Sequence, residues 1–356
     1  MTLRKFKIII LSIVLICIIF SGCAMLTNKT YSHAFGRIEE ASDDTFHTYI
    51  TWKDIDQNIY PRENVFFNSG GNMLEGFVYG KTNNNGLVVV SQGLGNTADH
   101  YLQLIMYFVD NGWRVFSYNN TGVSGSEGES VRGLTQSLFD LDAALLYISN
   151  TDELKYLPIM LVGHSWGGFA VCAILNYEYK INAVVSFAGF NNGNEVISDL
   201  GTSKIGRTFN LFSNKIKNIE NQMFGSASLL TAVDGINNTN IPVLIVHSSD
   251  DDVINAKTAA IYAHRNNITN PNAEIIFFDG DNASGHEFVF CSKEQKEYLK
   301  WAAESWKKYK SKNRKALKSK WAEENNFDVF KANELNKELM NKINILFNNA
   351  KLLHQN

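Results

Sequence analysis

PIMLVGHSWGGFAV, at residues 158–171, joins two apolar runs through a serine that stands between glycines. The first run, residues 158–162, is short and continuously apolar, a pattern typical of a strand buried on both faces. After Ser165 the apolar residues recur at the spacing of a helix. The stretch therefore predicts a parallel strand that turns sharply into a helix at Ser165. Gly163 and Gly167 lack a Cβ, which lets the two backbones approach each other closely.

Strands and helices alternate along most of the remaining chain. The expected strands lie near residues 64–67, 74–79, 87–90, 114–118, 183–187, 242–246 and 274–278. The first two flank a Gly-rich turn and predict an antiparallel hairpin. The others are short apolar runs separated by segments of helical periodicity. This pattern predicts the α/β class: a doubly wound, mostly parallel sheet covered by helices on both faces, with the hairpin at its edge.

The composition and the order of the segments predict how the chain is divided. With 356 residues, 45% of them hydrophobic and only 4 prolines, it has the composition of a folded protein. We expect a signal peptide at 1–22, a tether and lead-in segment at 23–60, an α/β domain at 61–305 and a C-terminal helical extension at 306–356. Residues 190–240 break the alternation, which predicts a small cap over the carboxyl ends of the strands or a surface insertion.

The N-terminus resembles the export signal of a bacterial lipoprotein. Three basic residues precede an apolar stretch at residues 8–20, which is short for a membrane span. Ser21, Gly22 and Cys23 then resemble a lipobox, in which cleavage frees the Cys and its thiol receives a diacylglycerol, although Phe20 departs from the usual aliphatic residue. The resemblance implies an exported protein anchored to the cell membrane through lipidated Cys23. A secreted protein and an uncleaved signal anchor are the alternatives.

Gly163-His164-Ser165-Trp166-Gly167 also matches G-x-S-x-G, a motif that presents a nucleophilic serine on a strand-to-helix turn. A Gly- and Ser-rich turn without chemistry is the alternative. A serine hydroxyl is a weak nucleophile and needs a base that a third group orients. In the doubly wound hydrolase arrangement, the acid and then the histidine follow the serine along the chain.

His286 is the candidate base, because it lies in a flexible loop just after the last expected strand. His264 falls in a predicted helix, and His354 is two residues from the C-terminus. The candidate acid follows the strand at 242–246, where three consecutive carboxylates occur. Asp251 is the choice and Asp250 the alternative, since one buried carboxylate can accept the histidine N–H and fix its tautomer.

Charge that develops on a substrate carbonyl oxygen needs preorganised hydrogen-bond donors. One expected donor is the backbone N–H of Trp166, at the start of the helix, where N–H groups lack intrahelical partners. The other is the N–H of Leu94, in the Gly-rich loop after the strand at 87–90. No cluster of Cys and His suggests a metal site, and no cofactor is expected. Cys172 and Cys291 are expected to be buried free thiols.

Taken together, these motifs resemble the α/β-hydrolase superfamily over roughly residues 60–305. The group most similar is that of esterases, monoglyceride lipases and serine aminopeptidases. The resemblance rests on residues 163–168, 93–94, 118–128, 247–251 and 285–286. Two positions depart from the usual pattern: Gln92 stands where the family usually has His before the oxyanion-loop glycine, and Ser248 where it usually has Gly after His247.

The resemblance implies a serine hydrolase of small or lipid-like carboxylic esters, with Ser165, Asp251 and His286 as its triad. A peptidase or amidase and an acyltransferase use the same parts and stay open. A non-catalytic surface protein that binds a partner is a remote alternative. The expected partners are a small acyl ester and, through Cys23, a membrane surface. Nucleic acid is not expected, because the net charge is −3 and removal of residues 1–22 leaves 30 basic against 36 acidic residues.

A basic segment stands out near the C-terminus. Residues 307–320 carry eight basic residues and no acidic residue. A solvated helix face is one interpretation. The other is attraction to anionic phospholipid, which the proposed lipid anchor would bring close. The apolar stripe that follows, at residues 335–353, predicts a helix packed on the body of the protein.

Overall fold

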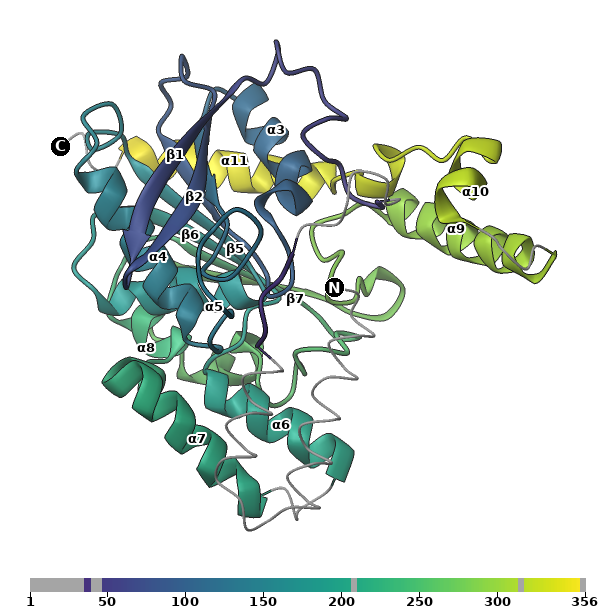
Figure 1. Cartoon of the computed structure of the whole chain (residues 1–356). Coiled ribbons are helices and arrows are strands. Elements are labelled where there is room, and N and C mark those ends of the chain that lie inside the picture. Colours follow the sequence, from purple (N-terminus) through teal and green to yellow (C-terminus); the bar gives the residue numbers. More distant parts are fainter. Residues whose placement is uncertain (1–34, 40–46, 206–209, 313–316, 353–356) are drawn as a thin grey trace.

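The computed structural model describes residues 35–39, 47–205, 210–312 and 317–352. Within these residues, one eight-stranded sheet of order β1-β2-β4-β3-β5-β6-β7-β8 forms the centre of the molecule (Figure 1). Its strands are β1 (Arg62–Ser69), β2 (Asn72–Tyr79), β3 (Leu87–Ser91), β4 (Arg114–Tyr118), β5 (Ile159–His164), β6 (Ile181–Phe187), β7 (Val243–Ser248) and β8 (Ala273–Phe278).

Strands β3 to β8 are parallel to their neighbours, and the β1–β2 hairpin adds to the edge of β4 in the antiparallel direction. Gly70 and Gly71 form the turn of the hairpin with φ of +57° and +94°, values that favour glycine. The predicted α/β class and the mostly parallel sheet with an antiparallel edge are confirmed. Such a sheet brings the carboxyl ends of its parallel strands to one edge, where the loops that follow them can meet.

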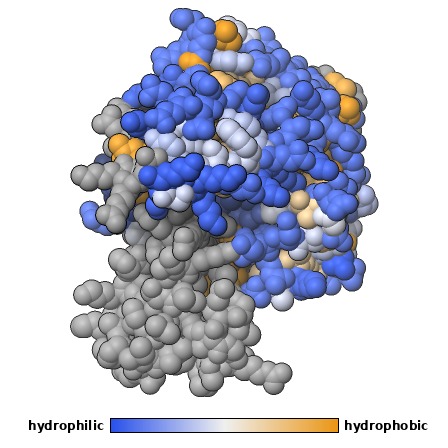
Figure 2. All heavy atoms as spheres, turned by 90° about the vertical axis from the view of Figure 1, so that its right-hand side faces the viewer, coloured by the Kyte–Doolittle hydropathy of each residue, from blue (hydrophilic) through white to orange (hydrophobic). Residues whose placement is uncertain are grey.

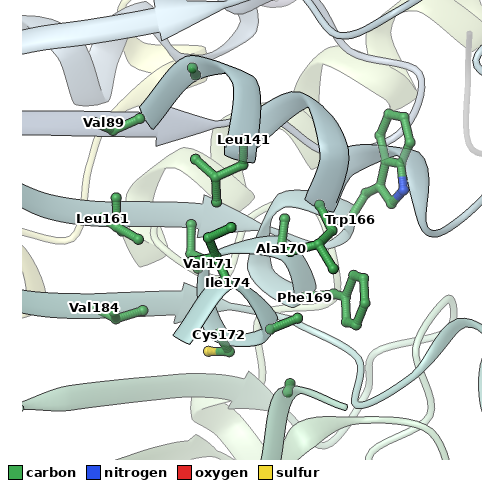
Figure 3. Close-up of a cluster of buried hydrophobic side chains, with 14 of the residues drawn as sticks. Val89, Leu141, Leu161, Trp166, Phe169, Ala170, Val171, Cys172, Ile174 and Val184 are labelled. Carbon is green, nitrogen blue, oxygen red and sulfur yellow. The ribbon is translucent and has the colours of Figure 1, made fainter. Parts of the chain in front are cut away.

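Helices cover both faces of the sheet. One face packs against α4 (Gln136–Ser149), α5 (Trp166–Ala173) and α8 (Ala232–Asn237), and the other against α3 (Leu102–Asp110) and α11 (Lys337–Leu352). All eight residues of α5 are buried. Figure 3 shows apolar side chains of α5 among those of strands β3, β5 and β6, including Val171 beside Leu161. This packing fixes the start of α5, and with it Ser165, against the sheet.

The described residues within 190–240 are largely helical. They contain α6 (Gly193–Ile205), α7 (Asn210–Phe224) and α8, and α6 and α7 lie together at the lower end of the molecule in Figure 1. Glu220 of α7 is 1% exposed and accepts hydrogen bonds from the backbone N–H of Leu134 and the hydroxyl of Thr135. The segment is therefore tied to the loop that precedes α4.

The connections also contain short 3-10 helices. These are η1 (Ala98–Tyr101), η2 (Ile174–Asn176), η4 (Gly225–Leu229), η5 (Ile261–Asn267), η6 (Gly280–Asn282) and η7 (Lys331–Asn333). Two of them border the carboxyl edge of the sheet: η1 follows the loop after β3, and η6 begins the loop after β8.

Helices α9 (Lys293–Lys312) and α10 (Lys318–Glu324) form an arm that projects from the body (Figure 1). Helix α9 runs across residue 305, where the sequence places the end of the α/β domain. Trp321 of α10 is 2% exposed and packs against Trp301 and Trp306 of α9, at ring-centroid distances of 6.4 and 6.2 Å. The arm thus has a small aromatic core of its own, whereas α11 returns to the sheet.

The side of the molecule from which the arm extends is mostly hydrophilic, with scattered apolar patches (Figure 2). Among the helices that the structure describes, none combines the length and the apolar character needed to cross a bilayer. The expected signal peptide and Cys23 lie outside the described residues. Cys172 and Cys291 are buried free thiols, as predicted.

Candidate active site

The turn between β5 and α5 holds Ser165 in a backbone conformation that serine rarely adopts. Its φ is +54° and its ψ is −109°. A Cβ on Gly163 would lie 2.2 Å from the carbonyl oxygen of Gly167, and one on Gly167 would lie 2.1 Å from that of Ser91. No real side chain tolerates such distances, so both positions require glycine. The turn therefore stores strain at one serine and projects it from the carboxyl edge of the sheet.

Three side chains from distant parts of the chain meet at this turn. The hydroxyl Oγ of Ser165 lies 2.8 Å from Nε2 of His286, and Nδ1 of His286 lies 2.8 Å from Oδ2 of Asp251. Because a carboxylate only accepts, Nδ1 carries the proton and donates it, and Nε2 is left to accept the Ser165 O–H. All three residues are at most 9% exposed. The structure thus brings together the three residues that the sequence singled out.

The charges of this set are coupled. Burial by itself would lower the pKa of the His286 imidazole, but the Asp251 carboxylate, with smaller contributions from Glu287 and Asp252, holds the pKa of His286 above its ordinary value. Burial would raise the pKa of Asp251, but His286 and then His247 outweigh it and keep that pKa below its ordinary value. Asp251 therefore stays ionised while His286 takes up a proton.

Backbone donors separate the roles of the two neighbouring acids. Oδ1 of Asp251 accepts from the N–H groups of Val253 and Ile254 at 2.9 and 2.8 Å, which leaves Oδ2 facing His286. Asp250 instead accepts from the Ser248 hydroxyl and from the backbone N–H of Gly285, at 2.6 and 2.7 Å. Asp251 is therefore the carboxylate that contacts the imidazole, and Asp250 ties the loop after β7 to the loop that carries His286.

A cavity opens beside Ser165. It is lined by Leu94, Leu134, Ser165, Trp166, Phe190, Val196, Val253, Ile254, His286 and Glu287. The two residues expected to donate backbone N–H groups, Leu94 and Trp166, both lie on its wall. Val196 comes from α6, so the segment at 190–240 reaches the site. Apart from the Ser165–His286 pair and Glu287, the lining is apolar, which suits the hydrocarbon part of a small organic ligand.

Two polar residues near Ser165 were not selected from the sequence. Glu287 lines the cavity, and among the described residues its carboxylate has no hydrogen bond or ion pair. Its position directly after His286 was a signal that could have been used. Tyr101 contacts His164, the residue before Ser165, through a hydrogen bond of 2.9 Å. That pairing joins residues 63 positions apart, so no local pattern predicts it.

Comparison with known proteins agrees with this architecture. A family model described as "Serine aminopeptidase, S33" matches residues 82–223, which include Ser165 but end before Asp251 and His286. Two crystal forms of an esterase of Pyrococcus furiosus superpose with TM-scores of 0.50 and 0.51 at 14% identity. The alignments cover 71% and 70% of this chain and 91% and 90% of the esterase. The chain has the α/β-hydrolase fold.

At 14% identity the solved esterase shows the fold of this α/β-hydrolase and nothing finer. An acylaminoacyl peptidase of Pyrococcus horikoshii aligns with 64% of this chain and 38% of its own, at 18% identity and a TM-score of 0.48. No curated protein sequence matches the chain. The family match and the fold identify an α/β-hydrolase enzyme, and its substrate has to be argued from the site.

Proposed function

We propose that this α/β-hydrolase is a serine hydrolase of carboxylic esters that works through an acyl-enzyme on Ser165. The observation that carries the proposal is the continuous hydrogen-bond chain from Ser165 through His286 to Asp251, with both bonds at 2.8 Å. In this geometry the imidazole is already the correct tautomer and already contacts the hydroxyl that it must deprotonate.

Acylation begins when Ser165 Oγ attacks the ester carbonyl carbon and its proton passes to Nε2 of His286. The Asp251 carboxylate stabilises the imidazolium that forms. The N–H groups of Leu94 and Trp166 are the proposed donors to the oxyanion. When the tetrahedral intermediate collapses, the C–O bond breaks and His286 returns the proton to the departing alkoxide. Water then repeats the sequence on the acyl-enzyme and releases the acid.

The apolar wall of the cavity supports an acyl chain as the group that is recognised. Phe190 and Val196 come from the segment after β6, whereas Val253 and Ile254 follow the loop that carries Asp251. Each buried CH₂ of an acyl chain contributes about 0.8 kcal/mol to binding. Transfer of the acyl group to an alcohol acceptor uses the same residues and is the alternative outcome.

A fluorophosphonate probe tests the proposal directly, because it reacts covalently with an activated serine and needs no knowledge of the substrate. We expect stoichiometric labelling of the wild-type protein and none of Ser165→Ala. A panel of p-nitrophenyl esters of increasing acyl length then measures the acyl preference. Absence of labelling in the folded wild-type protein would favour a non-catalytic binding protein on this fold.

One observation favours a second candidate, the hydrolysis of aminoacyl substrates. Glu287 is half-buried and brings a carboxylate to a cavity whose remaining wall is mostly apolar. Burial raises the pKa of Glu287, because the carboxylate loses contact with water. The neighbouring His286 opposes this shift but does not cancel it. A cationic amine on the substrate would restore a partner for the charge. The substrates of an aminopeptidase or of an aminoacyl esterase carry such an amine.

Glu287→Gln separates the two candidates. If the site binds an amine, the wild-type protein prefers an alanyl ester over the propionyl ester of the same alcohol, and the variant loses roughly 10- to 100-fold of that preference, the value of a charge-assisted hydrogen bond. The measurement is the ratio of kcat/KM for the two esters. Asp281→Asn, which removes an exposed carboxylate from the same loop, is the control. Equal ratios of kcat/KM in the wild type and Glu287→Gln would reject the aminoacyl candidate and favour an ester hydrolase that does not recognise an amine.

For localisation, we propose that the protein is exported and held at the membrane by a lipid on Cys23. The motif at residues 20–23 and the preceding apolar stretch support this proposal. Replacement of Cys23 by Ala, followed by detergent phase partitioning and by the mass of the mature N-terminus, tests it. Unchanged partitioning with normal processing would point to a signal anchor instead.

The projecting arm adds a second proposed contact with the membrane. The lysines at positions 307, 308, 310, 312, 318 and 320 are exposed on α9 and α10. Leu317, at the start of α10, is 65% exposed, and Trp301 is 42% exposed. A basic surface with exposed apolar side chains suits an anionic bilayer, where each lysine near the surface contributes about 1 kcal/mol at low salt.

We expect a soluble form that lacks residues 1–23 to bind vesicles of anionic phospholipid at low salt and to release them at high salt, because salt screens the lysines. Replacement of residues 307, 308, 310 and 312 by Gln should weaken binding roughly a hundredfold or more. Vesicle cosedimentation measures this. The control replaces four exposed lysines elsewhere, at 155, 180, 257 and 331, which changes the net charge equally. Equal binding by the two variants would return the arm to a solvated helix pair.

A further inference from the structure

A second buried hydrogen-bond chain runs beside the Ser165 set and contains none of its side chains. The backbone N–H of Gly93 donates to Oη of Tyr101 at 2.8 Å, and Oη of Tyr101 lies 2.9 Å from Nδ1 of His164. Nε2 of His164 lies 3.0 Å from the backbone carbonyl oxygen of His286. Tyr101 is 2% exposed and His164 is 3% exposed. We call this the Tyr101–His164 chain.

The direction of every proton in the Tyr101–His164 chain follows from its two ends. The carbonyl oxygen of His286 can only accept, so Nε2 of His164 carries a proton. Burial, and then the nearby His286 ring, lower the pKa of His164 to about 3, so the ring is neutral and Nδ1 is an acceptor. Tyr101 must therefore donate to Nδ1. Its oxygen in turn accepts from Gly93 N–H and from the side-chain amide of Asn96, at 3.1 Å.

The Tyr101–His164 chain joins three separate parts of the site. Gly93 lies in the loop after β3, directly before Leu94; His164 ends β5, directly before Ser165; and His286 lies in the loop after β8. A Cβ on Gly93 would lie 3.0 Å from Oη of Tyr101 and 3.1 Å from Nδ1 of His164, so the loop packs directly onto the pair. A displacement of the Gly93 loop would therefore also displace the backbone of His286, and the reverse.

We propose that Tyr101 and His164 are positioning residues that couple the loop bearing the Leu94 donor to the backbone of His286, so that both approach Ser165 in one fixed geometry. This inference rests on the proposed serine-hydrolase function. Asp251 orients the imidazole from its Nδ1 side, whereas His164 holds the backbone from which that imidazole extends. The Gly93–Tyr101 bond fixes the peptide unit next to the one that carries the Leu94 N–H. Both devices act on placement, because neither side chain forms a hydrogen bond to Ser165 Oγ or to the His286 ring nitrogens, although the rings of His164 and His286 pack at a centroid distance of 5.0 Å.

Tyr101→Phe tests the coupling, since it removes one hydroxyl and keeps the ring. We expect kcat for a p-nitrophenyl ester to fall roughly 10- to 100-fold with KM nearly unchanged, because a displacement of about 1 Å at reacting groups costs on that order. The acid limb of the pH–rate profile should stay where it is, because the His286–Asp251 pair that sets it is untouched. Rates are divided by the number of sites titrated with fluorophosphonate, so partly unfolded protein does not lower them.

Variants of His164 supply the rescue test. His164→Leu removes the donor to the His286 carbonyl and should lose at least as much kcat as Tyr101→Phe. His164→Gln places an amide N–H where it can reach the same carbonyl and should recover part of the loss. If His164→Leu does not fold, Tyr101→Phe still decides the question. Tyr107→Phe is the matched control, because its hydroxyl donates to Oδ1 of Asn341 at 3.2 Å, an exposed contact between α3 and α11, and it should keep the wild-type kcat.

Two results distinguish this inference from the function on which it rests. If Ser165→Ala keeps its turnover and its labelling, the proposed function is wrong. If Ser165 is required but Tyr101→Phe turns over at the wild-type rate, the function stands and the coupling is wrong. A loss of kcat in Tyr101→Phe that appears together with a shifted acid limb would also overturn the coupling, because the defect would then lie in the ionisation of His286.

Discussion

Ser165→Ala is expected to lower the turnover of a p-nitrophenyl ester by roughly 10⁴-fold or more, because the proposed mechanism has no other group that can form the acyl-enzyme. His286→Ala should cost about as much, since the serine hydroxyl lies 2.8 Å from Nε2 and has no other base within reach among the described residues. The double variant should be little worse than either single one, because the two residues act as a unit. Steady-state kcat/KM and fluorophosphonate labelling measure all three.

His264→Ala is the matched control for the histidine. Nε2 of His264 lies 2.9 Å from the Glu195 carboxylate, so the substitution removes a partly exposed polar contact and touches none of the reacting groups. Its kcat should stay within a few-fold of wild type. Near-wild-type turnover by Ser165→Ala or by His286→Ala in pure, folded protein would remove the mechanism.

Asp251→Asn is expected to lower kcat roughly 10³- to 10⁴-fold, because an amide no longer holds the imidazole in the tautomer whose Nε2 accepts the Ser165 proton. Asp250→Asn should cost only a few-fold. The oxygen of an asparagine can still accept from the Ser248 hydroxyl and the Gly285 N–H, so the loop contact survives. The two acids differ by one position in the chain, and each variant serves as the control for the other. A crippled Asp250→Asn beside an active Asp251→Asn would reverse the assignment.

The pH dependence of turnover should also differ between the wild type and Asp251→Asn. Turnover needs a neutral His286, so it is lost as the pH falls through the pKa of that imidazole. In the wild-type protein Asp251, helped by Glu287 and Asp252, raises the pKa of His286 against the effect of burial. Once the Asp251 carboxylate is gone, burial is opposed only by the smaller effects of Glu287 and Asp252, so the pKa of His286 falls. The residual activity of Asp251→Asn should therefore persist to lower pH than that of the wild type. A pH–rate profile of both proteins on one ester checks this, and an acid limb that moves to higher pH would contradict it.

Local sequence was enough to predict the turn at Ser165 and the sheet around it. The apolar run at 158–162 and the helical spacing after Ser165 gave the order strand, turn, helix, and steric contact explains the two glycines: a side chain at Gly163 or Gly167 would collide with the backbone. Short apolar strands alternating with helices predicted a mostly parallel sheet, because such strands are buried on both faces. These features depend on neighbours along the chain, so a pattern can reveal them.

The C-terminal helices show which contacts a local sequence pattern can predict and which it cannot. An apolar stripe predicted that the last helix packs on the body, and α11 does bury Leu339, Met340 and Ile343 against it. A pattern of this kind could not show that α9 projects from the body. The periodicity of a helix is the same on both sides of residue 305, whether or not the helix contacts the sheet. Whether a helix contacts a body or projects from it depends on partners that are distant in sequence.

The sequence by itself determined the candidate nucleophile, base and acid, since motif, chain order and loop position each narrowed the choice. It favoured Asp251 and kept Asp250 as the alternative. In the structure the N–H groups of Val253 and Ile254 orient the Asp251 carboxylate toward His286, a contact that the sequence does not reveal. The tertiary structure alone placed Glu287 on the cavity wall and Tyr101 against His164. Both depend on how loops from separate strands meet at the carboxyl edge of the sheet, and hydrogen bonds between such loops leave no periodic trace in the chain.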